Sequence, residues 1–186
     1  MKHMISLLLV LLLIFSLSAC SSAAEEAEDS PSSAQTEETE QGSKAVENMA
    51  KPNPQGALEE IYAQLDRSTG LVDATDAELR DVMGFDLETI EEYYVRYMET
   101  DYGASDVYII KPKEGEENSV REALKDWQES RIRAFSGYDI YNSTAISENA
   151  VIFQRGDYLV MLMLEDNDGA RSIIEAHIPE KLDLND

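Results

Sequence analysis

Residues 21–55 contain almost no side chain that could join a hydrophobic core, which confines the folded domain to the part of the chain that follows. The segment is built from Ser, Ala, Glu, Thr, Gln and Pro, and no aromatic or long aliphatic residue precedes Val46. No basic residue before Lys44 compensates its acids, which are Glu25, Glu26, Glu28, Asp29, Glu37, Glu38 and Glu40. Such a composition cannot bury enough apolar surface to offset the entropy of ordering, so we expect a disordered tether. A random coil of about 35 residues spans roughly 30–35 Å, and self-repulsion extends it further.

The first twenty residues have the layout of a bacterial secretory signal. Lys2 and His3 form a short basic start, residues 5–17 are almost wholly apolar, and small residues precede Cys20. The apolar run is about a dozen residues long, whereas a membrane-spanning helix needs about 20. The pattern therefore predicts a signal peptide rather than a membrane span.

The end of this signal, Leu17-Ser18-Ala19-Cys20, resembles the lipobox of bacterial lipoproteins. The resemblance implies that residues 1–19 are removed and that Cys20 becomes a diacylglycerol-modified N-terminus. The protein would then face the extracellular side of the cell membrane, lipid-anchored in the outer leaflet. Two acyl chains hold a protein stably, at about 0.8 kcal/mol per buried methylene. The alternative is an ordinary secretory signal followed by a chance cysteine.

Charge and cysteine content exclude several functions. The chain has 38 acidic and 15 basic residues, a formal charge of −23, and such a field repels nucleic acid. The same charge disfavours adsorption to anionic lipid, which leaves the acyl chains on Cys20 as the membrane anchor. Because Cys20 is the only cysteine, its acylation leaves no thiol for a disulfide or for cysteine-based catalysis.

Hydrophobic periodicity predicts one α+β domain over residues 56–178. Leu58, Ile61, Tyr62 and Leu65 share a helical face. We expect helices over residues 57–67, 75–83, 119–135 and 169–177, and strands over residues 92–99, 106–111, 150–154 and 158–164. Residues 159–164 are apolar without alternation, so this strand should be covered on both faces or lie at the centre of the sheet. The order predicts a mainly antiparallel four-stranded sheet with helices packed on one face, preceded by N-terminal helices and followed by a tail over residues 179–186.

Three stretches of this domain are similar to a known family. They are Leu79–Asp86, the segment "IEEYYVRYMETDYGASDVYIIKPKEG", and the hairpin "AVIFQRGDYLVMLML". Together with the helix between them they resemble the domain of unknown function 4358 family, found in lipoproteins of Gram-positive bacteria. The resemblance covers about residues 56–178. That family has no assigned activity, so the resemblance carries over no functional residue.

Metal and cofactor sites are not expected. His177 is the only histidine of the mature chain, and a cation at the end of a helix suits the helix dipole. With no second histidine and no free thiol, a nitrogen or sulfur metal site is not predicted. Setting Gly169 at the sixth place of a calcium loop puts Glu175 at the twelfth, but the first place is Leu164, which has no side-chain oxygen. We therefore expect a strand-to-helix turn there.

Tyrosines offer the best candidate for ligand contact. Five of them cluster in the segment of residues 93–108, namely Tyr93, Tyr94, Tyr97, Tyr102 and Tyr108. Exposed rings could stack on sugars of a wall glycan or contact an envelope protein, whereas the structural alternative is cross-strand packing in a half-exposed sheet. Arg155-Gly156-Asp157 spells an adhesion tripeptide but also suits a tight hairpin turn.

These observations predict a membrane-anchored extracytoplasmic lipoprotein whose domain is a non-catalytic binding or interaction module. The alternative is a carboxylate-based hydrolase acting on cell-wall glycan or peptide. Such an enzyme needs two opposed carboxylates, and spacing identifies no such pair among the 38 acids. A solute-capturing transporter component would need two lobes, and the folded part is long enough for one.

Replacing Cys20 by serine tests the anchor. Because serine offers no thiol to acylate, we expect the Cys20→Ser protein to leave the membrane fraction and appear in the medium, as followed by fractionation and intact-mass spectrometry. A Cys20→Ser protein that stayed membrane-bound and unprocessed would contradict the lipobox interpretation.

Overall fold

The computed structural model describes residues 51–65 and 68–181. All of them belong to one of the two units into which the chain divides, Gln41–Asp186. The signal segment, Cys20 and the acidic segment up to residue 50 lie outside the described residues, as does the tail from residue 182.

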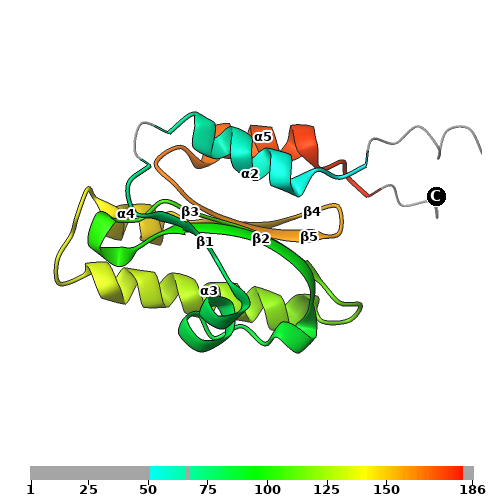
Figure 1. Ribbon diagram of the computed structural model, residues 1–186, viewed down its shortest axis with the longest axis horizontal. Coiled ribbons are helices and arrows are strands. Elements are labelled where there is room, and N and C mark those ends of the chain that lie inside the picture. Colours follow the sequence, from blue (N-terminus) through cyan, green and yellow to red (C-terminus); the bar gives the residue numbers. More distant parts are fainter. Residues whose placement is uncertain (1–50, 66–67, 182–186) are drawn as a thin grey trace, which may run out of the picture. The chain divides into compact units, whose positions relative to one another are not determined.

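Five antiparallel strands form the central sheet (Figure 1). They are β1 (Leu71–Asp73), β2 (Ile90–Met98), β3 (Asp106–Pro112), β4 (Val151–Arg155) and β5 (Tyr158–Met163). Their order across the sheet is β1-β2-β3-β5-β4, so β3 is central. Tyr108 of β3 lies opposite Val95 of β2 on one side and Met161 of β5 on the other. The hairpin predicted around Gly156 and Asp157 is confirmed, with Arg155 opposite Tyr158.

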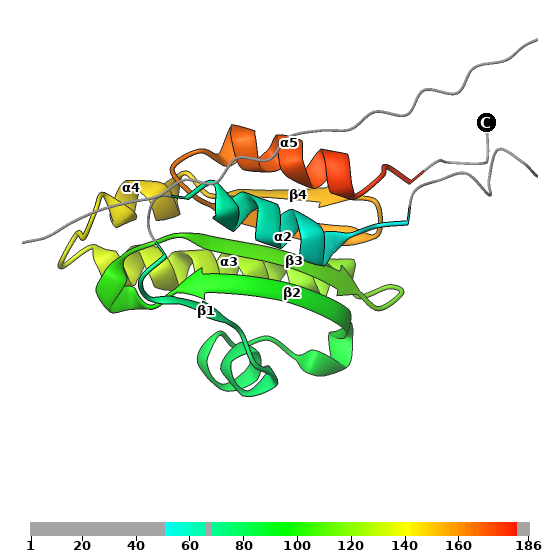
Figure 2. The same ribbon diagram turned by 45° about the horizontal axis from the view of Figure 1, so that its top comes forward.

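Helices cover both faces of this sheet (Figures 1 and 2). On one face lie α2 (Pro54–Ala63) and α5 (Asn167–His177), and on the other lies α3 (Glu117–Phe135), with α4 (Ser143–Glu148) packed beside it. A short π-helix, η1 (Glu78–Val82), joins the α3 side, and two 3-10 turns, η2 (Leu87–Thr89) and η3 (Thr100–Tyr102), flank β2. In the part of the chain that the structure describes, no helix is long and apolar enough to cross a membrane.

Strand β5 explains why both faces need cover. Its six residues are all buried, and successive side chains of a strand point to opposite faces. Leu159, Met161 and Met163 join the core beneath α3, whereas Val160 and Leu162 join the core beneath α2 and α5. The prediction that this strand is covered on both faces is confirmed.

The predicted sheet was wrong in two respects. It has five strands rather than four, because the sequence pattern assigned no element to β1, whose three residues are too few to show alternation. Helices pack on both faces rather than on one, because an apolar stripe shows that a helix is covered but not which face it covers. The α+β class and the antiparallel pairing are confirmed.

The segments before β2 differ in their helix types. α2 begins at Pro54, three residues before the predicted start, because the Asn53 side chain caps it by accepting from the Gly56 N–H at 3.0 Å. The predicted capping box is present, since Glu78 accepts from the Thr75 N–H at 2.7 Å and the Thr75 hydroxyl accepts from the Glu78 N–H at 3.3 Å. The segment then winds as the π-helix η1 rather than an α-helix, and it ends before Gly84, whose φ is 80°.

A buried ion pair joins α3 to the centre of the sheet. Arg131 is 2% exposed and Asp106 is 0% exposed, with Nε and Oδ2 3.0 Å apart. That contact is an ion pair rather than a directed hydrogen bond, but Arg131 Nη2 also donates to Asp106 Oδ1 at 3.1 Å. Asp106 Oδ1 further accepts from the Met98 and Ser105 N–H groups at 3.1 and 3.2 Å. The guanidinium of Arg131 is therefore buried together with the stem of its side chain.

Removing one charge of this pair should destabilise the domain strongly. Asp106→Asn leaves the Arg131 guanidinium buried without its counter-charge, and such changes cost about 3–5 kcal/mol. Urea denaturation measures the loss. The matched control is Glu122→Gln, which breaks the exposed 2.7 Å pair with Lys125 and should cost less than about 1 kcal/mol. Equal costs for the two variants would show that the buried pair has no special role.

The capping box of Thr75 and Glu78 should make the stability of the domain depend on pH. Hydrogen bonds from the Thr75 backbone and hydroxyl lower the pKa of Glu78 below its ordinary value of 4.5. Because the folded pKa is the lower one, this stabilisation is present above the unfolded pKa and is lost as pH falls through the folded pKa. Thr75→Ala should raise the pKa of Glu78 in an NMR carboxyl titration and cost about 0.5–2 kcal/mol at neutral pH. The same substitution at the exposed Thr69 should leave the Glu78 titration unchanged.

Candidate functional site

One end of the domain gathers the connections that carry its exposed aromatic rings. The connections after β2, after α3 and after β5 meet at the left of Figure 1, beside α4, whereas α2 begins and α5 ends at the right (Figures 1 and 2). At that right-hand end the Asn53 N–H donates to the His177 carbonyl at 3.0 Å. The chain therefore enters the domain at the end opposite these connections. We call residues 99–105, 136–149 and 164–168 the distal end.

Arg131 organises the first distal connection, between β2 and β3. Its Nη2 donates to the carbonyls of Met98 and Gly103 at 3.0 and 2.9 Å, and its Nη1 donates to the Thr100 hydroxyl at 3.0 Å. Gly103 has φ of 115°, and a Cβ there would lie 3.0 Å from Ser143 Oγ. A side chain at this position would be strained and crowded, so glycine lets the two loops approach.

The second distal connection, between α3 and α4, is bound to the first through Ser143. Its hydroxyl accepts from the Ala104 N–H at 2.8 Å and donates to the Ile140 carbonyl. Asp139 accepts from the Thr144 N–H at 2.9 Å, and the Thr144 hydroxyl donates to the Phe135 carbonyl at 3.2 Å. The two loops therefore hold each other in place.

Two successive residues of this second loop have left-handed backbone conformations. Tyr141 has φ of 50° and Asn142 has φ of 61°. This region is common for asparagine but rare for tyrosine, and the left-handed conformation costs roughly 1–2 kcal/mol per residue. Strain of this kind persists only where the surroundings enforce it, and it concentrates at functional sites.

Three tyrosines of these two loops are exposed. Tyr102 is 42% exposed, Tyr138 is 76% exposed and Tyr141 is 64% exposed. Among the described residues, the only other exposed large hydrophobic side chain is that of Val82. The Tyr102 ring lies against Gly70, since a Cβ on that glycine would come within 2.4 Å of ring carbons. Exposed rings with a polar tip are typical of contact surfaces.

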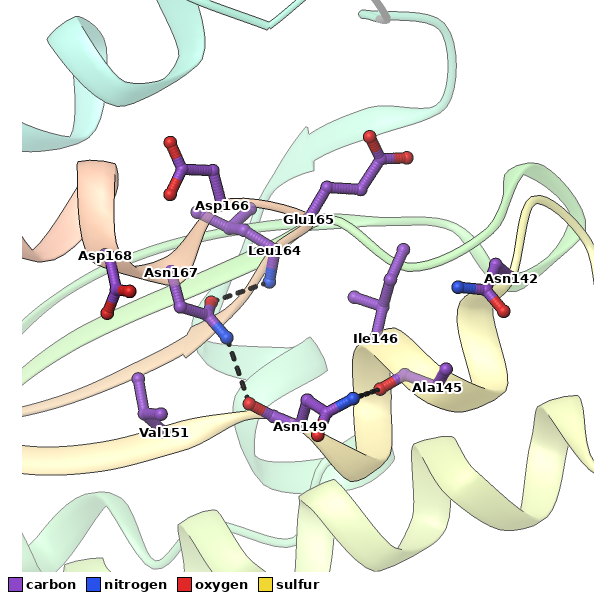
Figure 3. A pocket seen from close by; sticks show the side chains of 10 residues that line it. All are labelled: Asn142, Ala145, Ile146, Asn149, Val151, Leu164, Glu165, Asp166, Asn167 and Asp168. Atoms are coloured by element: carbon purple, nitrogen blue, oxygen red, sulfur yellow. Dashed lines mark hydrogen bonds between the residues drawn. The ribbon is translucent and has the colours of Figure 1, made fainter.

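An open hollow of about 630 Å³ lies beside these loops, between α4 and the start of α5 (Figure 3). The side-chain amides of two asparagines connect the segments that line this hollow. Asn167 Oδ1 accepts from the Leu164 N–H, Asn167 Nδ2 donates to the Asn149 carbonyl, and Asn149 Nδ2 donates to the Ala145 carbonyl, at 3.0, 3.0 and 2.9 Å. These bonds join α4 to the β5–α5 turn, so the hollow has a fixed shape.

Carboxylates line the rim of this hollow. Glu165 and Asp166 border both it and a smaller hollow of about 190 Å³ against Ala104 and Ser105, and in Figure 3 their carboxylates extend to the same side. Asp166 caps α5 by accepting from the Gly169 N–H at 2.8 Å, and Glu175 pairs with Arg171 at 3.2 Å. The segment is thus the expected strand-to-helix turn. Among residues 51–65 and 68–181, no three or more His, Cys, Asp and Glu side chains are grouped to hold a metal ion.

The five tyrosines predicted from sequence do not form one surface. Tyr108 is 0% exposed and its hydroxyl accepts from the Trp127 indole, so the prediction that it contacts a ligand was wrong. Tyr93 and Tyr97 pack on the α3 side and Tyr94 on the opposite side. Burial and a hydrogen bond to Asp76 raise the pKa of Tyr93 to about 12. Tyr102 alone of the five is exposed at the distal end.

The other singled-out residues have structural roles. His177 Nε2 lies 2.8 Å from Glu60 and so joins α5 to α2. Arg155 donates to the Ile178 carbonyl at 2.7 Å, and Asp157 pairs with Lys181 at 2.9 Å. The Arg155-Gly156-Asp157 turn therefore fastens the end of α5 to the hairpin.

Comparison with known proteins establishes the family. A family model described as a domain of unknown function (DUF4358) matches residues 63–164. The chain belongs to this family, as the sequence resemblance predicted. No curated protein and no solved structure matches the chain.

Sequence reasoning did not single out Tyr138 and Tyr141. They lie in "SGYDIYN", where glycine, aspartate and asparagine indicate a turn-rich loop. A tyrosine in such a loop is not part of an apolar helix or strand pattern. The lack of such a pattern could have predicted that both rings are exposed.

Proposed function

We propose that the protein is an extracytoplasmic lipoprotein, anchored in the outer leaflet of the cell membrane through Cys20, and that its domain is a binding module. Its contact surface is the distal end, with Tyr102, Tyr138 and Tyr141 as the contacting rings. The partner is a component of the cell envelope, either a protein or a wall glycan. The signal-like N-terminus and the acidic segment after it support the anchor and the tether.

The observation that carries the binding proposal is the position of the exposed rings relative to the point where the chain enters. The backbone of Asn53 is bonded to the end of α5 at His177. The connections after β2 and after α3, which contain the exposed tyrosines, lie at the other end of the sheet (Figure 1). A tether attached at the first end leaves the second end free to meet a partner away from the membrane.

The polar groups of the distal end favour binding over catalysis. Asp139 and Asp166 accept from backbone N–H groups, and the amides of Asn149 and Asn167 hold neighbouring elements. Asp106 is 0% exposed and is paired with the buried Arg131. These groups maintain a fixed surface, and a fixed surface reduces the entropy lost on binding.

Site-specific photocrosslinking in living cells tests the proposal. A photoreactive phenylalanine analogue at Tyr141 of the full chain should give a discrete adduct with an envelope component, identified by mass spectrometry. The matched control places the same analogue at Val82, which is 63% exposed but lies on η1. The adduct should be absent at Val82.

Two results would overturn the binding proposal. One is an equal yield of adducts at Tyr141 and Val82, or none at either. The other is hydrolysis of wall glycan or peptide by the purified full chain that Glu165→Gln abolishes, which would make the distal end a carboxylate-based active site.

A further inference from the structure

Strand β4 forms an open edge of the sheet. It pairs with β5 on one side and stands last in the strand order, so among the described residues no strand pairs with its other side. The turn after β4 is two residues long, so Arg155 and Tyr158, which close it, exchange backbone hydrogen bonds. Hydrogen-bonded and non-hydrogen-bonded pairs alternate along an antiparallel ladder. The N–H and C=O groups of Ile152 and Gln154 therefore point away from β5.

This edge lacks the usual protection against an added strand. Proteins protect sheet edges by keeping them short, or with charges, prolines and bulges. The opposite edge, β1, has three residues and carries Asp73, whereas β4 has five, and none of its first four residues is charged or a proline. No hydrogen bond from another described segment reaches the backbone of Ile152 or Gln154. The edge of β4 can therefore accept another strand.

A guanidinium with unused donors lies beside the middle of this strand. Helix α5 passes over β4, and the Arg171 Cζ lies 4.4 Å from the Phe153 ring centroid (Figure 2). Arg171 Nε donates to Glu175 at 3.2 Å, but its two Nη groups have no hydrogen-bond partner among the described residues. An arginine fork binds a carboxylate with two parallel hydrogen bonds. Arg171 can therefore bind a second carboxylate.

From these two features we infer that the edge of β4 binds an extended polypeptide segment of a partner protein, which adds to the sheet as an antiparallel strand. Its backbone bonds to the free N–H and C=O groups of Ile152 and Gln154. The partner residue opposite Phe153 lies on the same face, beside Arg171, and is acidic. Its two neighbours lie on the other face, beside the half-buried Ile152, and are apolar. This surface is separate from the exposed rings, so the inference goes beyond the proposed function.

Local charges favour this occupant over a second copy of the chain. The formal charge of −23 is spread over the whole chain, and charges more than about 8 Å away are largely screened at physiological ionic strength. At the edge itself, Glu175 and Glu180 are already paired with Arg171 and Arg155. A second β4 pairing about Phe153 would bring two Arg171 guanidiniums together, whereas an acidic residue complements the one that is there.

An NMR titration with three peptides tests the inference. The full chain, nitrogen-15-labelled and purified in detergent, is titrated with GSTVDVTSG, with GSTVKVTSG, and with GSTVDVTSG whose two valines are N-methylated. N-methylation keeps the side chains but removes the N–H groups that would pair with β4. We expect the first peptide to bind and to shift the amide signals of Ile152 and Gln154 most. The other two should bind about tenfold more weakly or less.

Two pairs of variants locate the site. Arg171→Gln should weaken binding of GSTVDVTSG about three- to tenfold. Arg133→Gln, which breaks the matching i,i+4 pair with Glu129, should change it less than about twofold. Gln154→Pro removes an N–H that no described residue uses, so the domain should fold but not bind the peptide. Gln154→Ala, which keeps that N–H, should bind it. Thermal melting reports whether each variant is folded.

Several results would overturn the inference. Equal binding of the N-methylated peptide would exclude strand addition, even if Gln154→Pro failed to fold. Equal binding of the lysine peptide, or equal losses for Arg171→Gln and Arg133→Gln, would exclude the acidic partner. Slow hydrogen exchange of the Ile152 and Gln154 amides in the free chain would show that the edge is already covered. A dimer in sedimentation that Gln154→Pro dissociates would make a second copy the occupant.

Failure here is distinguishable from failure of the proposed function. The crosslinking experiment reads an adduct at Tyr141, and the titration reads the backbone of β4. If the adduct forms while GSTVDVTSG does not bind, the distal end remains a contact surface and the inference about β4 is wrong.

Discussion

The ion pair between Arg131 and Asp106 fixes the geometry on which the rest of this domain depends. A single guanidinium, 2% exposed, reaches the end of β2, the loop after it and the start of β3. It comes from α3, so the same contact places that helix against the sheet. Its Cζ also lies 4.8 and 6.0 Å from the ring centroids of Phe135 and Trp127, which exclude water from the pair. Because a buried charge without a partner is so unfavourable, this arrangement selects one position of the β2–β3 loop.

That loop in turn positions the candidate surface. Gly103 and Ala104 lie against Ser143, and Ser143 holds the loop of Tyr138 and Tyr141. These contacts between the two loops maintain the left-handed backbone at Tyr141 and Asn142. The exposed rings are thus presented by a rigid support, although they lie on loops.

Family membership places this chain beside other proteins that carry the same domain but adds no functional residue. The case for binding therefore comes from this chain's own surface. The exposed rings of Tyr102, Tyr138 and Tyr141 lie on loops at the end opposite the point where the chain enters. The anchor at Cys20 and the acidic tether are inferences from sequence, and both lie outside the described residues.

Much of the fold could be read from the sequence, because local signals determine local structure. The apolar run of β5, the hairpin at Gly156 and the box of Thr75 and Glu78 each depend on neighbours a few residues away, and each is present. The family resemblance was also visible in sequence. Strand β1 was missed because three residues are too few to show the alternation of apolar and polar side chains. The helices were assigned to one face of the sheet because the apolar side of a helix does not indicate which face of the sheet it covers.

The sequence by itself determined the α+β class, the mainly antiparallel pairing of the strands, the signal-like start and the acidic composition. Tertiary structure alone decided that Arg131 would be buried with Asp106, 25 residues away in the chain. It also decided that Tyr108 would be buried while Tyr138 and Tyr141 would be exposed. The physical reason is that exposure and charge pairing depend on contacts between distant segments, which periodicity and spacing do not encode.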